Sequence, residues 1–161
     1  MAFAFSPLLE PAPDSRLASA IVWFDALISN VDRTARNTNM LLWRDRLWLI
    51  DHGAALFFHH AADWLSSYPA RSRSPFPQVK DHVLLRWAGE LEATDAALRN
   101  RLSPWTFEQA VALVPDVWLN GRGSEASAAA QRAVYTAYLN QRWEASQVFV
   151  QEALRARDAL L

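Results

Sequence analysis

Two short apolar runs, residues 40–43 and 47–50, restrict the fold of this chain more than any other feature. They flank the charged triplet Arg44-Asp45-Arg46, and apolar runs of this length around a polar turn predict a β-hairpin. Apolar residues elsewhere recur mainly at helical spacing. The sequence therefore predicts an α+β fold that is mainly α-helical and contains one hairpin.

Helices are predicted on both sides of this hairpin. Residues 1–15 are expected to form an irregular, proline-rich lead-in, with Asp14 or Ser15 as the N-cap of a helix over 16–29. Residues 54–78 contain several prolines, serines and arginines, which predict an extended, partly mobile loop. A helical bundle is expected over residues 79–161, with segments at 79–88, 90–101, 106–114 and 124–161.

The last of these segments has predicted boundaries of its own. Gly121-Arg122-Gly123 is expected to break the chain before it, Ser124 to cap it, and Asn140 to divide it into two helices. Residues 1–161 together are predicted to form a single domain.

Composition excludes several classes of protein. Hydrophobic residues make up 52% of the 161 residues, too many for a disordered segment. The net charge of -1 gives no basic footprint, so no direct binding of nucleic acid is expected. Residues 1–10 are apolar but lack a basic start and are interrupted by proline, and no other apolar stretch reaches the length of a membrane span. We therefore expect a cytoplasmic protein without a membrane segment.

The polar stretch before the hairpin carries the candidate chemistry. Asp32 and Asn37 are five residues apart on a predicted loop, and the hairpin returns a second carboxylate, Asp51, beside them. Two carboxylates and an amide oxygen form the hard, oxygen-rich site that Mg²⁺ prefers. Protein kinases use this order, with a catalytic loop H-R-D-x-x-x-x-N followed by D-F-G. Asp51-His52-Gly53 occupies the D-F-G place here.

The stretch FDALISNVDRTARNTNMLLWRDRLWLIDHGAALFF resembles the HipA-like kinase family, whose members carry an N-x-D-R-x-x-x-N loop after an F-D-x-L-type helix. The match is strongest over about residues 20–60. It implies a kinase-like C-lobe that transfers the ATP γ-phosphoryl group to Ser or Thr of a protein, and several family members act in toxin–antitoxin systems. Asp32 would be the catalytic base, Arg33 would order the loop by pairing with carboxylates or carbonyls, and Asn37 and Asp51 would hold Mg²⁺.

The resemblance has departures. Thr34 stands where a histidine often follows the D-R pair, and His52 replaces the Phe of D-F-G. No glycine precedes Gly53 and the only lysine is Lys80, so a Gly-rich loop and a strand lysine are expected from a separate N-lobe chain. Without that lobe we expect apolar groups of the hairpin and of residues 1–9 to be exposed, then covered by the N-terminal segment, a second copy or a partner.

Other patterns have alternative interpretations. His52, His59, His60 and Asp63 form a candidate zinc cluster, although adjacent histidines point in different directions. Residues 71–74, Arg-Ser-Arg-Ser, are either a phosphorylatable activation segment or a solvated loop. The tryptophans are expected mainly in the core. A non-catalytic, pseudokinase-type interaction module is the alternative to a kinase.

Overall fold

The structure is a computed structural model that describes residues 1–8, 10–120 and 126–161. It is mainly helical with a small antiparallel sheet, which confirms the predicted α+β class. The elements, in chain order, are β1 (Ala2–Ala4), α1 (Ser15–Leu27), β2 (Met40–Trp43), β3 (Arg46–Leu49), η1 (Phe57–His60), α2 (Trp64–Ser72), η2 (Pro77–Asp81), η3 (Leu85–Trp87), α3 (Leu91–Arg101), α4 (Pro104–Ala112), α5 (Asp116–Asn120), α6 (Ala128–Glu144) and α7 (Ser146–Asp158).

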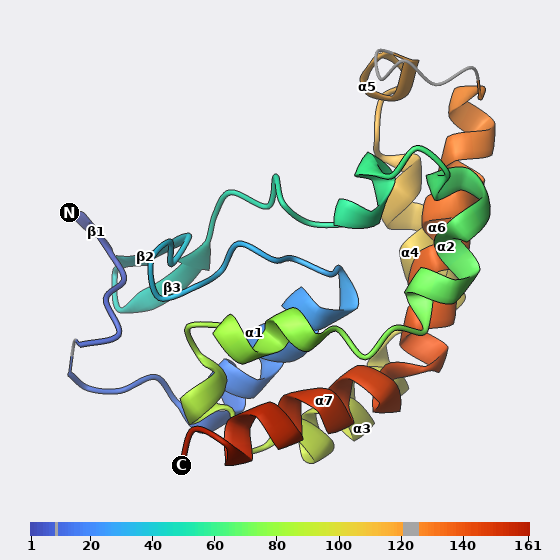
Figure 1. Cartoon of the computed structure of the whole chain (residues 1–161). Coiled ribbons are helices and arrows are strands. Elements are labelled where there is room, and N and C mark those ends of the chain that lie inside the picture. Colours follow the sequence, from blue (N-terminus) through green and yellow to red (C-terminus); the bar gives the residue numbers. More distant parts are fainter. Residues whose placement is uncertain (9, 121–125) are drawn as a thin grey trace.

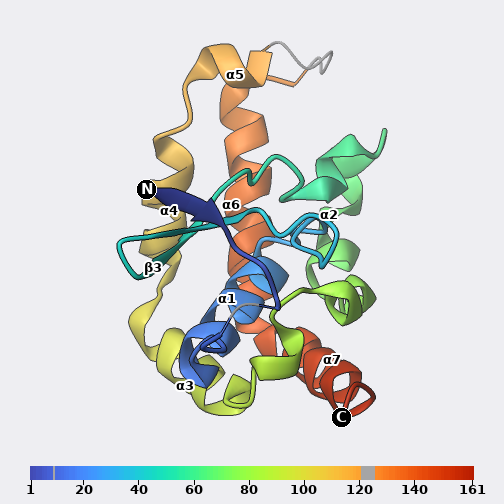
Figure 2. The same ribbon diagram turned by 90° about the vertical axis from the view of Figure 1, so that its left-hand side faces the viewer.

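The helices form the body of the molecule, and the sheet lies to one side of it (Figure 1). The long helix α6 packs between α2 and α4, while α1 packs against α3 and α7 (Figure 2). Trp23 of α1 is 1% exposed and meets the ring of Phe149 edge-on, with centroids 5.7 Å apart. Apolar burial between helices that are distant in sequence is therefore the main stabilising contribution to the fold.

The predicted hairpin is present, with a tighter turn than expected. Met40 pairs with Leu49 and Trp43 with Arg46, so Arg46 belongs to β3 and the turn contains only Arg44 and Asp45. Their φ angles are 50° and 58°. Two-residue hairpin loops with positive φ at both positions match the right-handed twist of the strands, although non-glycine residues are strained there.

The lead-in contains a strand that was not predicted. Residues 2–4 form β1, which pairs antiparallel with β2, and the amide of Phe5 continues the ladder to the carbonyl of Met40 at 2.9 Å. Phe5 is buried against the core. The reason is that β2 offers a second edge, which an apolar N-terminal segment can cover. Asp14 caps α1 by accepting from the amide of Leu17, as predicted.

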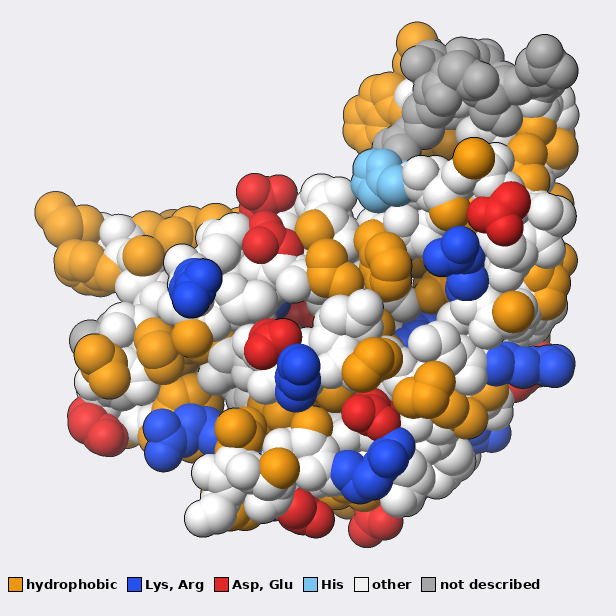
Figure 3. All heavy atoms as spheres, in the orientation of Figure 1, with side chains coloured by type: hydrophobic (Ala, Val, Ile, Leu, Met, Phe, Trp, Pro, Cys, Tyr) orange, Lys and Arg blue, Asp and Glu red, His pale blue; other side chains and the backbone are white. Residues whose placement is uncertain are grey.

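Apolar side chains remain exposed around this sheet, as expected from the sequence. Met1, Phe3, Trp43 and Trp48 are 97%, 57%, 37% and 47% exposed, and hydrophobic side chains gather where β1 and the hairpin project (Figure 3). Leu9 lies outside the described residues. Trp105 and Trp118 are also largely exposed, so the expectation that the tryptophans lie mainly in the core is wrong for these two residues.

The expectation of an extended loop over residues 54–78 is wrong, because this segment contains η1 and α2. Pro69 lies inside α2, where it removes one backbone hydrogen bond and disfavours the helix. Packing of Trp64 against Phe58 and Tyr135, with ring centroids 6.0 and 5.2 Å away, offsets this cost. Burial of aromatic side chains therefore decides the conformation of this segment more than its number of prolines does.

The continuous helix predicted over residues 79–88 is also wrong. Two short 3₁₀ turns, η2 and η3, flank His82, whose backbone is extended. The amide of Val83 donates to the carbonyl of Arg33 at 3.0 Å, and His82 forms a β-bridge with Thr34. These hydrogen bonds to a distant loop outweigh the local helical preference.

The C-terminal stretch divides at Ala145 and not at Asn140. Arg99 donates to the carbonyls of Trp143 and Glu144 at 3.3 and 3.0 Å, which satisfies acceptors left free at the end of α6. Helix α5 was not predicted as a separate element. The predicted break at Gly121-Arg122-Gly123 and the cap at Ser124 lie outside the described residues.

The strained hairpin turn gives a testable prediction. Asp45→Gly should raise the free energy of unfolding by about 1 kcal/mol, because glycine adopts a φ near 58° without the steric cost of a side chain. Urea unfolding followed by tryptophan fluorescence measures this change. The control, Asp45→Val, places a β-branched residue there and should lower stability. Equal stabilities for the two variants would contradict the assigned turn geometry.

Candidate functional site

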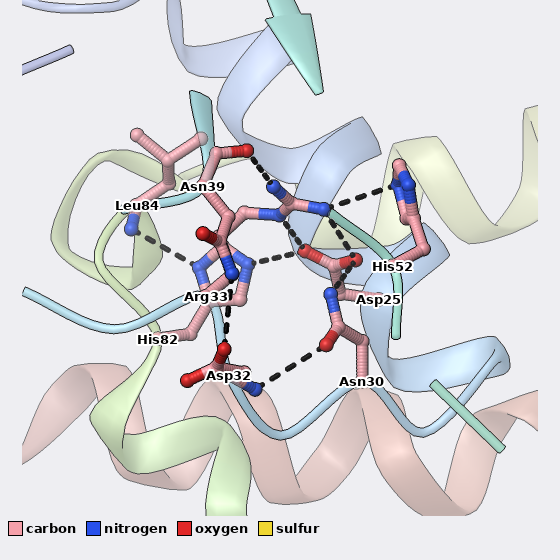
Figure 4. Close-up of polar contacts among 8 residues, drawn as sticks. All are labelled: Asp25, Asn30, Asp32, Arg33, Asn39, His52, His82 and Leu84. Carbon is pink, nitrogen blue, oxygen red and sulfur yellow. Dashed lines mark hydrogen bonds and ion pairs between the residues drawn. The ribbon is translucent and has the colours of Figure 1, made fainter. Parts of the chain in front are cut away.

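The site is organised around Asp25, a carboxylate near the end of α1 that is 0% exposed. Figure 4 shows the side chains that converge on it. Arg33 donates through Nε to Oδ2 and through Nη2 to Oδ1, while the Asn30 side-chain amide donates to Oδ1 at 3.0 Å. His82 Nε2 lies 2.9 Å from Oδ2. Asp25 therefore joins α1, the following loop and the segment after η2.

The protonation states in this cluster follow from its hydrogen bonds. The amide of Leu84 donates to His82 Nδ1 at 3.0 Å, so Nδ1 is an acceptor and Nε2 carries the proton that is donated to Asp25. Burial acts to raise the pKa of Asp25, but the hydrogen bonds from His82 and Arg33 and the positive charge of Arg33 outweigh it, and the pKa is lowered from 3.8. Asp25 is thus ionised and pairs with a buried Arg33.

Arg33 connects this cluster to the hairpin. It is 1% exposed, and besides Asp25 it donates through Nη1 to the carbonyl of Asn39, the residue before β2. Its Nη2 lies 3.2 Å from Nε2 of His52, which follows β3. As expected from the sequence, Arg33 pairs with a carboxylate and a carbonyl. It thereby fixes the loop relative to both ends of the hairpin.

Asp32 and Asn37 converge as predicted. The side-chain amide of Asn37 donates to Asp32 Oδ2 at 2.7 Å, and that of Asn39 donates to the same oxygen at 3.1 Å. The backbone also closes here, because the amide of Thr34 donates to the carbonyl of Asn37 at 3.0 Å. The Asp32 side chain is therefore held on a tightly turned, half-buried loop.

Asp51 approaches this loop through its neighbours. The amide of Ile50 donates to the carbonyl of Asn39 at 3.0 Å, and His52 contacts Arg33. Asp51 itself is exposed, has a φ of 48°, and accepts at Oδ1 from the amide of Gly53 at 3.3 Å. Within the described residues it makes no hydrogen bond to Asp32 or Asn37. The carboxylate therefore faces solvent beside the loop.

The oxygen donors of this set suit a hard cation. Asn37 uses its amide nitrogen on Asp32, which leaves its side-chain oxygen as the atom suited to Mg²⁺, and Asp51 offers an exposed carboxylate. Asp32 adds a second carboxylate. In the described part of the chain, no group of three His, Asp or Glu side chains is arranged to hold a metal ion. The alternative zinc cluster at His52, His59, His60 and Asp63 is therefore not formed.

Sequence reasoning missed Asp25 and His82 as parts of this site. In the sequence, Asp25 is only the Asp of the F-D-x-L motif, although a carboxylate on an apolar helix face, eight residues before an arginine, is a usable signal. His82 gave no local signal, since it lies 57 residues from Asp25 within a segment predicted to be helical.

In the Arg-Ser-Arg-Ser segment, Ser72 is buried and donates to Pro69 O or Gln141 Oε1.

Comparison of the chain with protein-family models, curated proteins and solved structures found no match. No helix in the described ranges combines the length and apolar character that crossing a bilayer requires.

The buried pair gives the second prediction. Asp25→Ala should lower the free energy of unfolding at neutral pH by about 3–5 kcal/mol, because it leaves the guanidinium of Arg33 buried without its anion. Urea unfolding measures the loss. Asp81→Ala removes an exposed carboxylate next to His82 and should change stability by less than about 0.5 kcal/mol.

The same variant tests the lowered pKa of Asp25. A carboxylate whose folded-state pKa lies below its unfolded value stabilises the fold above that unfolded value. This contribution is lost as pH falls below 3.8 towards the folded-state pKa. The stability gap between the wild type and Asp25→Ala should therefore narrow in that acidic range. A gap independent of pH would show that Asp25 is not the titrating group.

Proposed function

We propose that this chain is the C-lobe of a HipA-like kinase, which transfers the γ-phosphoryl group of ATP to a protein Ser or Thr when an N-lobe complements it. One observation carries the proposal. Asp32 and Asn37 are paired on a loop that Arg33 anchors to the buried Asp25, and Arg33 also contacts His52 beside Asp51. The order of Asp32, Asn37 and Asp51 along the chain is that of the catalytic loop and metal-binding motif of protein kinases, which supports the proposal.

Each residue has a distinct proposed role. Asp32 would accept the proton of the attacking Ser or Thr hydroxyl. At the same time the hydroxyl oxygen would bond to the γ-phosphorus of ATP, and the bond from that phosphorus to the bridging oxygen of the leaving ADP would break. Asn37 and Asp51 would hold Mg²⁺, which when bound neutralises charge on the phosphates. Arg33 touches no substrate in this scheme and acts as a positioning residue. It would fix the orientation of Asp32 through the loop backbone.

The exposed edge of the sheet supports the proposed dependence on a second lobe. Apolar patches on a soluble protein commonly mark contact surfaces. Trp43 and Trp48 are exposed side by side on one face of the projecting sheet, and Phe3 is exposed on its other face. We propose that the N-lobe packs against this sheet and that it comes from a separate chain or from another part of a longer protein. Self-association of two copies through the sheet is the alternative. A cytoplasmic location and a role in a toxin–antitoxin system belong to the same proposal.

A second candidate function is a non-catalytic, pseudokinase-type interaction module. The observation that favours it is the double hydrogen bond from Asn37 and Asn39 to Asp32 Oδ2. The two amides occupy Oδ2, one of the two oxygens through which Asp32 would accept a proton from a substrate. In this alternative the loop would serve only to shape a binding surface.

The first prediction from the kinase proposal concerns nucleotide binding. The 161-residue chain alone should bind Mg-ATP with a dissociation constant on the order of 1 mM or weaker, and turn it over negligibly. Gly-loop, adenine and lysine contacts are expected from the N-lobe, and positioning supplies most of the catalysis. Calorimetry tests this, with ADP and magnesium-free ATP as controls. Micromolar affinity of the isolated chain would contradict the proposed division between lobes.

The second prediction separates the roles of the two carboxylates in the complemented protein. Asp32→Asn should lower the phosphoryl-transfer rate by about 10²–10⁴-fold while leaving Mg-ATP affinity nearly unchanged. Asp51→Asn should weaken Mg-ATP binding as well as turnover, because a metal ligand contacts the phosphates through the ion. The exposed Asp45→Asn is the matched control. Small, equal effects of all three changes would instead favour the interaction module.

A further inference from the structure

A second buried cation lies away from the candidate site, at Arg142 of α6. The residue is 1% exposed. Its Nε donates to the carbonyl of Ala26 at 2.7 Å, and its Nη1 donates to the carbonyls of Ser72 and Ser74 at 3.1 and 2.9 Å. Its Nη2 is buried without a hydrogen-bond partner. Among the described residues, no carboxylate pairs with this guanidinium.

A buried charge without a counterion is costly, and the surroundings of Arg142 compensate for it only in part. The rings of Phe76 and Phe149 lie 5.6 and 4.9 Å from the guanidinium carbon, where cation–π attraction contributes. Burial lowers the pKa of Arg142, as expected for a cation removed from water. An arginine nevertheless stays protonated in proteins. Positive charge is therefore left uncompensated in this region.

A hollow of about 190 Å³ adjoins this charge, between α2, α6 and the segment that leads to η2. Arg142 and Arg71 both line it, and its other polar residues are Ser29, Ser74, Gln78 and Tyr138. No carboxylate belongs to the lining. The volume accommodates several water-sized groups, and hence a tetrahedral oxyanion.

Arg71 is able to serve such an anion. Its only ion pair among the described residues is with Asp63 at 3.6 Å, and these side chains are 39% and 63% exposed. Exposed pairs of this kind contribute little to stability, so Arg71 can exchange Asp63 for a ligand at small cost. The planar guanidinium suits two parallel hydrogen bonds to a phosphate group.

We propose that this hollow is a binding site for a phosphate group. Arg71 provides the principal charge contact, Ser74 and Gln78 provide neutral hydrogen-bond donors, and Arg142 supplies the positive potential at the wall. An anion bound there connects α2 with α6 and compensates the buried charge. The proposal stands without the kinase hypothesis, because none of its residues belongs to the loop at 30–39 or to the hairpin. Arg71 and Ser74 do belong to the segment that the sequence offers as an activation segment.

Thermal unfolding of the full chain in inorganic phosphate tests the site, with sodium chloride added to keep ionic strength constant. The melting temperature should rise with phosphate concentration, as expected for a ligand that binds only the folded state. Arg71→Gln should weaken the apparent affinity at least about tenfold, the loss expected for one charge-assisted contact. Arg73→Gln removes a neighbouring exposed arginine and should leave affinity unchanged.

A second variant and a second ligand keep the outcome decisive. Circular dichroism shows whether Arg71→Gln folds. If it does not, Gln78→Leu provides the test, because it should also weaken the apparent affinity for phosphate. O-phosphoserine, run in parallel, distinguishes free phosphate from a phosphate carried on a peptide, and binding of either ligand that depends on Arg71 supports the site. The proposal is overturned if neither ligand raises the melting temperature above the chloride control, or if Arg71→Gln and Gln78→Leu respond like the wild type.

Discussion

The organisation of the site depends on the ion pair and hydrogen bonds of the Asp25 carboxylate. It is fully buried and accepts hydrogen bonds from Arg33, Asn30 and His82. Removing a charged group from water is favourable only where its partners are held in place. The Asp25 carboxylate therefore positions both the loop after α1 and the backbone at His82. Loss of this carboxylate would release both of them.

The backbone around this ion explains why a short hairpin stands at the centre of the arrangement. Asn39 before β2 and Asp51 after β3 both have positive φ angles, 45° and 48°, which turn the chain sharply at each end of the hairpin. The carbonyl of Asn39 accepts from Arg33 and from the amide of Ile50. Entry and exit of the hairpin thus meet at the same carbonyl, which brings Asp51 back beside the loop.

Sequence patterns predicted the parts of this structure that local interactions determine. The helix at 16–29, the hairpin and the convergence of Asp32 with Asn37 all follow from spacing within a few residues. The conformation of residues 79–88 does not follow from local spacing, because a hydrogen bond from Val83 to the distant Arg33 fixes it. Helix α2 was missed for a related reason: the packing of Trp64 on Tyr135 is not visible in its own sequence.

The contact between Trp23 and Phe149 has a consequence for how the chain acquires its structure during synthesis. Trp23 also donates to Asp95, which accepts from Gln147 as well. Helix α1 is translated before α3 and long before α7, the two helices that pack against it. Until α7 emerges, the indole of Trp23 lacks its contact with Phe149. Nascent chains in this interval are expected to be the form that chaperones recognise and that aggregates.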